Sequence, residues 1–398
     1  MNIQGVSPTA SQATARGSQK TLAPGAVLRA VLSEGFARSP SAVKSIAPAI
    51  AGAVDWTSVC AVAYRCRIAP IVYQSLRASA LAVPRDVMEW FRVQHYDNVA
   101  RNLASLNELR AVLNVFEAAG IRVVVFKGPA LAEAGYGMAR TWQDLDLLIR
   151  GDAVERVDAV LLRSGYPLRP EPPHHNHRRY GGGDDGRRGV LEVHFDISDP
   201  LRSHRPNVDA VWVRAVDTKI LGITARVPEI TDHLLLTMMQ LPHHHWSIRL
   251  LLDLRQVIER RRGDIDWDEV FQRAGAWQMM ALTKSALASL QAEFGLTLPD
   301  GVRERVRAGG YYDRLHREIA AQAITEQLEN PFRPKVMWIA PFVVVDHAGR
   351  VPAIIVRRLL AGGQVTEDGR VGRALRRNRT SLAALPALCR VLLASLRR

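Results

Sequence analysis

Apolar residues recur at helical spacing through the first third of the chain. Two segments, 56–67 and 102–119, place them three and four positions apart, so each would form a helix with one apolar face. These apolar positions are Val59, Val62, Ala63, Cys66, Leu103, Leu106, Leu109, Leu113 and Phe116. Pro70 interrupts the first helix, because proline has no backbone N–H to continue it. The pattern predicts a mostly helical N-terminal region.

Beyond this helical region, short apolar runs of strand length replace the helical spacing. Residues 121–126 form a β-branched run, and residues 144–149 form a second run that also contains acidic side chains. Each run predicts a strand followed by a helix. Pro129 suits the first turn of one helix, while Asp152 is predicted to cap the other and Gly165 to end it.

Two further strands and a return to helical spacing complete the pattern. Residues 177–182 and 189–197 are predicted to pair as a hairpin, with the glycine-bounded turn 183–186 between them. Helical spacing returns over 231–241 and 248–261. The order of helices, a short α/β core and more helices predicts an α+β protein, with a small mixed β-sheet core and flanking helical segments.

These changes of pattern divide the chain into five segments. We expect a disordered leader over 1–24, an N-terminal helical region over 25–119, an α/β core over 120–200, a helical region completing the pocket over 201–330, and a C-terminal extension with a basic tail over 331–398. The leader is rich in small and polar residues, a composition that cannot bury enough apolar surface to fold alone.

Charge adds a hypothesis about partners. The chain of 398 residues carries a formal net charge of +14, and a basic protein attracts nucleic acid, nucleotides or an anionic membrane. Much of this excess belongs to the tail, because residues 369–398 contain eight arginines and no acid. Nucleic acid is therefore not favoured as a partner, and the tail is expected to make at most a weak contact with a membrane surface.

Cysteines and apolar runs indicate the compartment. The chain has three cysteines, too few for a disulfide framework, and Cys60 and Cys66 are predicted to be buried helix residues. The longest apolar run, 336–345, contains Pro341 and is shorter than the roughly 18–20 residues that a membrane span needs. The expected location is the cytoplasm, without a transmembrane segment.

Three carboxylates in strand-like sequence predict a metal site. Asp144 and Asp146 are two residues apart, so on a strand they share one face, roughly 6–7 Å apart. Two acids on an apolar strand repel each other, and a hard divalent cation such as Mg²⁺ removes that cost. If the predicted strand at 189–197 lies beside the Asp144 strand, Glu192 completes a site of three carboxylates. Such a site could hold two ions, which activate an attacking oxygen and neutralise the phosphates in an in-line displacement.

The segment around Lys127 predicts a phosphate-binding turn. Lys127 and Gly128 end the first predicted strand just where a helix begins. Glycine allows a phosphate to approach the backbone, and the lysine adds a positive charge for triphosphate oxygens. Arg140 lies four residues before Asp144, close enough in sequence to reach the same phosphates.

The ordered set of 124–128, Arg140, 144–146 and 192–194 resembles the uncharacterised nucleotidyltransferase family of the DNA polymerase β superfamily. Further similarity lies in Asp55-Trp56, Ile68-Ala69-Pro70, His245-Trp246, Arg249 and Asp253. The resemblance covers roughly residues 50 to 260. In the superfamily a Gly-Ser turn usually binds triphosphate; here, as in the family, Lys-Gly takes its place and the third carboxylate is a glutamate.

This resemblance implies a Mg²⁺- or Mn²⁺-dependent transfer of a nucleotide from an NTP to an unidentified small molecule, peptide or protein, with release of pyrophosphate. Asp144, Asp146 and Glu192 are the expected catalytic and metal-binding residues. Lys127, Gly128 and Arg140 are the expected nucleotide-binding residues. His194 and His245 are candidates for contact with the acceptor or with the residues around the metal.

Other interpretations stand beside this one. In one alternative, the acids are ordinary strand-end carboxylates facing water and Lys127-Gly128 is a plain turn. Arg249 and Asp253, four residues apart, are most simply a helix salt bridge. The rival function is a catalytically degenerate fold that binds nucleic acid or protein. A kinase would need a Gly-rich loop or a Walker lysine, and the motif G-x-x-x-x-G-K-[ST] is absent. The histidine clusters at 174–177 and 243–245 lack the ligand spacing of a zinc site.

Overall fold

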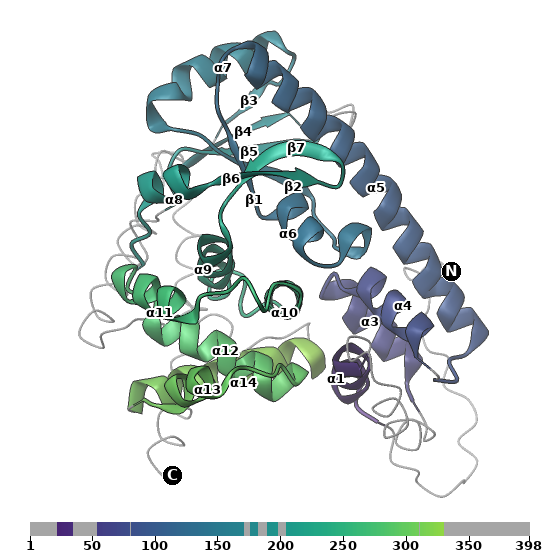
Figure 1. Cartoon of the computed structure of the whole chain (residues 1–398). Coiled ribbons are helices and arrows are strands. Elements are labelled where there is room, and N and C mark those ends of the chain that lie inside the picture. The colour runs from purple at the N-terminus through teal and green to yellow at the C-terminus, as the bar shows by residue number, and fades with distance from the viewer. Residues whose placement is uncertain are drawn as a thin grey trace, which may run out of the picture.

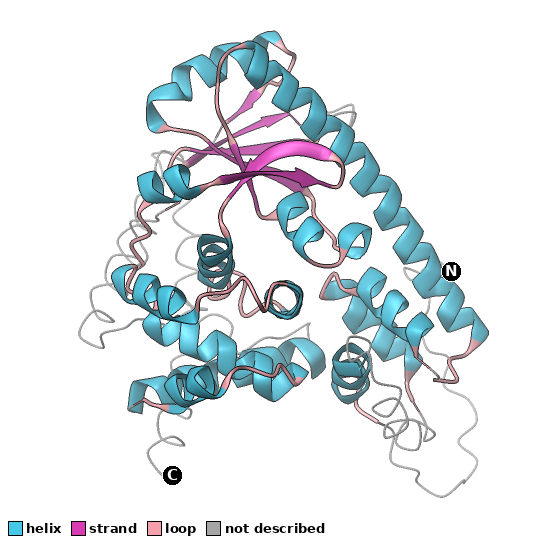
Figure 2. Ribbon diagram, in the orientation of Figure 1, coloured by secondary structure: helices cyan, strands magenta, loops and turns pink. Residues whose placement is uncertain are grey.

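The computed structural model places a small sheet among helices, with the later helices forming a layer beneath it (Figure 1). It describes residues 22–34, 54–79, 81–170, 176–181, 189–197, 204–309 and 311–329. Residues 1–21 of the predicted leader, the turn 183–186, and the C-terminal extension with its basic tail lie outside this part. Figure 2 shows the strands gathered in one region with helices around them. The predicted α+β class is confirmed.

The main sheet has the strand order β1-β2-β5-β4-β3. Its strands are β1 (Val124–Phe126), β2 (Asp144–Leu148), β3 (Leu168–Arg169), β4 (His177–Gly181) and β5 (Val190–His194). β2 and β5 are parallel, and the other pairs are antiparallel. Parallel neighbours need a crossover, which here includes α7 (Val154–Arg163). The predicted placement of the Glu192 strand beside the Asp144 strand is confirmed, as is the predicted hairpin.

The two faces of this sheet differ in chemistry, because successive residues of a strand point to opposite sides. One face packs with α7 and with α5 (Arg85–Ala118) in a shared apolar core. The strand residues in that core are Val125, Leu145, Leu147, Leu191 and Val193. The alternate positions on β2 and β5 include Asp144, Asp146, Glu192 and His194, so the strand alternation separates these polar side chains from this core.

Helix α5 is 34 residues long and runs along one side of the molecule, from the N-terminal helices to the sheet (Figure 1). Two buried amides on consecutive turns, Asn98 and Asn102, each donate to the carbonyl oxygens of both Met138 and Arg140, over 2.8 to 3.3 Å. These bonds satisfy carbonyl groups just before β2. They fix the segment that leads into the carboxylate strand against the long helix.

Three expectations about helices are wrong in detail. Leu103 is 53% exposed, because Asn102 turns inward to make its hydrogen bonds and rotates its neighbour outward. Asp152 does not cap α7; it lies in a 3₁₀ turn that precedes the helix. Cys60 and Cys66 are half-buried instead of buried, because their helix packs only one face against the core.

A second, two-stranded sheet pairs β6 (Val216–Ile220) with β7 (Ile223–Val227). The connecting residues Leu221 and Gly222 have φ of +48° and +86°, as a tight two-residue hairpin requires. The Leu221 N–H donates to the Glu133 carboxylate at 2.7 Å, which ties this hairpin to the helix after β1. Sequence analysis did not predict this hairpin.

The remaining helices form the second apolar core and one wall of the pocket. The early ones are α1 (Pro24–Glu34), α3 (Trp56–Arg65) and α4 (Ala69–Ala78), and α6 (Gly128–Ala134) follows β1. The later ones are α8 (Val208–Arg214), α9 (Ile230–Gln240), α10 (Ile248–Arg260), α11 (Trp267–Ala276), α12 (Met280–Phe294), α13 (Asp300–Arg307) and α14 (Tyr311–Glu329). None of the described helices combines the length and apolar character that crossing a membrane requires.

Candidate active site

A pocket of about 530 Å³ opens beside the polar face of the sheet. Its walls come from β2, β4 and β5, the turn between β1 and α6, the junction of α3 and α4, and the helices α9 and α10. The volume lies within the range of small-molecule sites. The pocket therefore brings together segments from the N-terminal helices, the sheet and the later helices.

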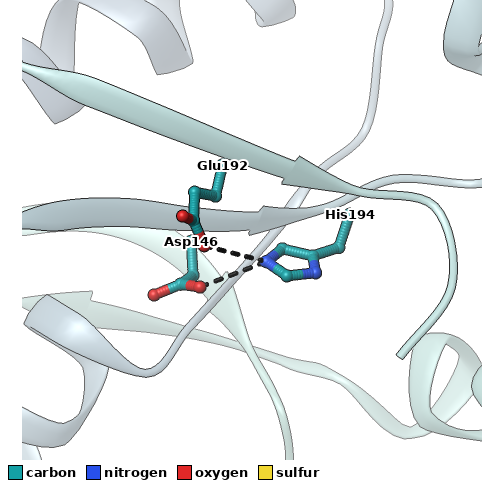
Figure 3. A group of neighbouring side chains, drawn as sticks. All are labelled: Asp146, Glu192 and His194. Carbon is teal, nitrogen blue, oxygen red and sulfur yellow. Dashed lines mark hydrogen bonds and ion pairs between the residues drawn. The ribbon is translucent and has the colours of Figure 1, made fainter. Parts of the chain in front are cut away.

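The strand register places the predicted carboxylates side by side. In the parallel β2–β5 pair, Asp146 lies opposite Glu192 and Leu148 opposite His194. Ligand atoms of Asp146, Glu192 and His194 all lie within 4.8 Å of one another (Figure 3). His194 Nε2 is 3.1 Å from Asp146 Oδ1 and 3.8 Å from Glu192 Oε2. This trio offers two carboxylates and an imidazole to a metal ion.

Asp144 lines the same pocket, two residues before Asp146 on the same strand face. It stands outside the closely spaced trio, although all three acids are near enough to influence one another. Burial raises the pKa of Asp144, and the charges of Asp146 and Glu192 raise it further, while Lys127 lowers it. The ionised Asp144 is thus destabilised by its surroundings, as two neighbouring carboxylates are without a cation between them.

For Asp146 the effects on the pKa balance the other way. Its side chain is almost fully buried, which alone would raise its pKa, but the Lys127 ammonium and the His194 hydrogen bond hold the pKa well below its usual range. Lys127 Nζ lies 2.5 Å from Asp146 Oδ1. Lys127 and His194 therefore stabilise the ionised form of Asp146.

Glu192 has a basic partner that sequence analysis missed. Arg179 lies directly opposite Glu192 in the antiparallel β4–β5 pair, and its Nη2 is 2.5 Å from Glu192 Oε1. The sequence does predict the hairpin that contains both residues. To predict that Arg179 faces Glu192, however, one must also know the register in which the two strands pair. That register depends on the loop geometry, which the apolar pattern leaves open.

The turn between β1 and α6 has an unusual backbone at the predicted phosphate-binding position. Lys127 has φ of +58° and ψ of −141°, a conformation normally reserved for glycine. Gly128 follows it, buried, and a Cβ on Gly128 would lie 3.4 Å from the Asp144 carbonyl oxygen. The turn is therefore packed tightly against the start of the carboxylate strand.

Arg140 lines the pocket, and its guanidinium is paired within the protein. Its side chain is 2% exposed; Nε donates to Asp253 Oδ1 at 3.0 Å, and Nη2 lies 3.0 Å from Oδ2. Nη1 donates to the Gly128 carbonyl at 3.1 Å. These contacts occupy the guanidinium, so Arg140 supports the turn at Lys127 and Gly128 through the Gly128 carbonyl. The expected Arg249–Asp253 helix ion pair is wrong, because Asp253 faces Arg140.

The two candidate histidines have different positions. His194 is buried, its ring packs edge-on against Phe126, and burial together with the Lys127 charge lowers its pKa to about 4, so it is neutral near pH 7. His245 is not among the described residues that line the pocket; its neighbours His243 and His244 are. The backbone of His245 has φ of +53°, and its carbonyl accepts a hydrogen bond from Gln327. His243 and His244 immediately precede this strained residue in the chain.

A small mixed sheet that carries a D-x-D pair on one strand and a third acid on its parallel neighbour, beside a tight turn, is the arrangement of a nucleotidyltransferase. The sequence profile of the family described as "Uncharacterised nucleotidyltransferase" matches residues 52–295, more than half of the chain, and the protein belongs to this family. The predicted family is thereby confirmed. The chain is a transferase enzyme, and its general reaction is nucleotidyl transfer.

Two solved structures of the antibiotic-resistance factor ANT(2'')-Ia are similar to part of the chain, each at 14% identity. A solution structure has a TM-score of 0.32 and covers 48% of this chain and 96% of that chain. A crystal structure in complex with adenylyl-2''-tobramycin has a TM-score of 0.31 and covers 44% and 96%. Similarity this low carries nothing about residues or substrates of the present chain. No curated protein matches the sequence.

Proposed function

We propose that this enzyme transfers a nucleotide from an NTP to an acceptor hydroxyl in the pocket, with Mg²⁺ or Mn²⁺ as cofactor and pyrophosphate as the second product. The observation that carries the proposal is the packed trio of Asp146, Glu192 and His194, whose ligand atoms lie within 4.8 Å of one another. Asp144 shares their pocket and completes the expected set of three acids.

The residues fit a divalent cation. Carboxylate oxygens are the ligands of Mg²⁺, and a neutral imidazole such as His194 is acceptable to Mn²⁺. Asp144 and Asp146 would hold the ion, with Glu192 beside them as the base; the ion, when bound, supplies charge neutralisation for the phosphates and a more acidic acceptor hydroxyl. The destabilised charge on Asp144 supports this assignment, because a nearby cation would relieve it.

The reaction is a displacement at the α-phosphorus of the NTP. A new bond forms between the acceptor oxygen and this phosphorus, while the bond to the β-phosphate oxygen breaks and pyrophosphate leaves. The acceptor hydroxyl gives up its proton, and Glu192 is the base assigned to receive it. Lys127 and Gly128 lie on the opposite side of β2 from Glu192, where they would hold the triphosphate.

The test of this function follows the label of the nucleotide. With α-labelled NTP and Mg²⁺ or Mn²⁺, label should pass to the protein itself or to a component of a cell extract or acceptor panel. A γ-label should appear in pyrophosphate, whereas a kinase would place it on the acceptor. EDTA should lower transfer at least about tenfold, because the triphosphate would then face uncompensated carboxylates. Transfer of the γ-label, or transfer unchanged by EDTA, would contradict the proposal.

Lys127 offers a test of the triphosphate-binding turn. We expect Lys127→Gly to weaken NTP binding about tenfold, because a positive charge near the phosphates is lost. Glycine suits the positive φ at this position, so the relaxed backbone should offset part of the lost ion pair with Asp146. Calorimetric titration and thermal melting measure both effects.

Lys219, exposed on β6 outside the pocket, provides the matched control, and Lys219→Ala should bind NTP as wild type does. If Lys127→Gly instead melted far below the wild type, Lys127 would be a structural residue. If it bound NTP normally, the assigned phosphate contact would be wrong.

A further inference from the structure

The basic residues that line the pocket fall into two groups. Lys127, Arg140 and Arg179 each face a carboxylate within the protein. Arg67 and Arg249 also line the pocket, but among the described residues neither has a carboxylate at ion-pair distance. Two guanidinium groups that line one pocket without an ion-pair partner favour an anion supplied from outside the chain.

Arg67 occupies a position where a side chain is costly. It follows α3 with φ of +57°, its N–H donates to the Tyr64 carbonyl, and the Ile68 N–H donates to the Ala63 carbonyl. This is a Schellman motif, whose left-handed residue is usually glycine. An arginine here strains the backbone and projects an exposed guanidinium at the pocket rim.

Arg249 lines the same pocket from α10. It is half-buried, and its Nη1 donates to the Thr141 carbonyl at 3.2 Å. Burial and the charges of Arg140 and Arg67 lower the pKa of Arg249 to about 10, although Asp253 and Asp144 partly counter this. The guanidinium is thus held among like charges, an arrangement that a bound anion would stabilise.

The position of the pair along the sheet indicates which anion binds. Strand β2 lies between β1 and β5 in the sheet, and Thr141 comes just before β2. The turn at Lys127 and Gly128 follows β1, on one side of β2. Glu192 lies on β5, on the other side. Helix α10 packs against α6, which starts at this turn. Arg249 therefore belongs to the side of the pocket that faces the turn, away from the acid assigned to the acceptor.

We propose that Arg67 and Arg249 bind the β- and γ-phosphates of the NTP and hold the pyrophosphate after transfer. This inference rests on the proposed function and assigns to these two arginines the phosphate contact expected of Arg140. Arginine donors match phosphate oxygens in planar pairs, which a lysine cannot do. The pocket would then grip the triphosphate from the turn on one side and from the helical wall on the other.

Calorimetry with magnesium present tests the pair on three probes: NTP, the corresponding nucleoside monophosphate and inorganic tripolyphosphate. Arg67→Gly and Arg249→Gln should each weaken NTP and tripolyphosphate binding about tenfold or more, and leave monophosphate binding unchanged. Arg67→Gly should melt no lower than wild type, since glycine relieves the positive φ. Arg101→Gln, an exposed α5 position outside the pocket, is the control and should bind all three as wild type does.

The outcomes separate this inference from the proposed function. The Arg67→Gly/Arg249→Gln double variant is compared with a wild type whose transfer activity requires Asp144. If the double variant then binds NTP and tripolyphosphate normally, the inference is overturned and the proposed function stands. Normal binding with a raised acceptor KM would also overturn it and would assign the arginines to an anionic acceptor. A wild-type protein that binds neither NTP nor tripolyphosphate would contradict both.

Discussion

Asp144→Asn and Asp146→Asn are each expected to lower nucleotidyl transfer by on the order of a thousandfold or more, because each removes a charge that would hold the metal while keeping the shape of the side chain. The measurement is label transfer from α-labelled NTP at saturating metal. If the Asp144→Asn variant labels an acceptor as well as the wild type does, the carboxylate face is not the active site and the proposed function fails.

The two variants should differ in stability, which guards against loss of activity through unfolding. The pKa of Asp144 is raised in the fold, so at pH 7, above its ordinary pKa, the ionised side chain opposes folding. Asp144→Asn should therefore unfold no more easily than wild type. The pKa of Asp146 is lowered by Lys127 and His194, so Asp146→Asn should be less stable. Equal destabilisation by both changes would contradict this electrostatic account.

Replacing Arg140 by methionine is expected to cost about 3–5 kcal/mol of unfolding free energy, because it leaves Asp253 buried without its charged partner. Chemical denaturation measures the loss. The double variant Arg140→Met/Asp253→Leu should recover much of it, since an apolar pair of similar volume often replaces a buried ion pair at little cost.

This experiment also decides how Arg140 acts. A residue that touches only phosphates would leave stability unchanged and would weaken NTP binding. A buried residue that supports the Gly128 carbonyl would change stability first. An Arg140→Met variant as stable as wild type would restore the sequence-based expectation of direct phosphate contact.

The sequence predicted the parts of the site that depend on local pattern. Strand alternation put Asp144 and Asp146 on one face, and the same alternation in β5 put Glu192 and His194 on the matching face. The apolar residues between them fix that orientation, because a shift of one residue would bury the acids in the core.

What the sequence could not predict depends on contacts between distant segments. Arg140 and Asp253 are 113 positions apart, and nothing in either local pattern indicates that they meet. Arg179 faces Glu192 only through the hairpin register. Arg67 acquires its place in the pocket from a left-handed helix end, where glycine is the usual residue, and no local pattern in the sequence indicates that conformation.

The paired amides of Asn98 and Asn102 also restrict how this family of chains can vary in length. Because α5 turns by about 100° per residue, an insertion between these amides and β1 would rotate the sheet-facing side of the helix relative to the anchored segment. An insertion before Asn98 would instead rotate only the end of α5 that contacts the N-terminal helices. Natural length changes in α5 should therefore accumulate ahead of the two asparagines, leaving the spacing from Asn98 to the end of the helix at Ala118 constant.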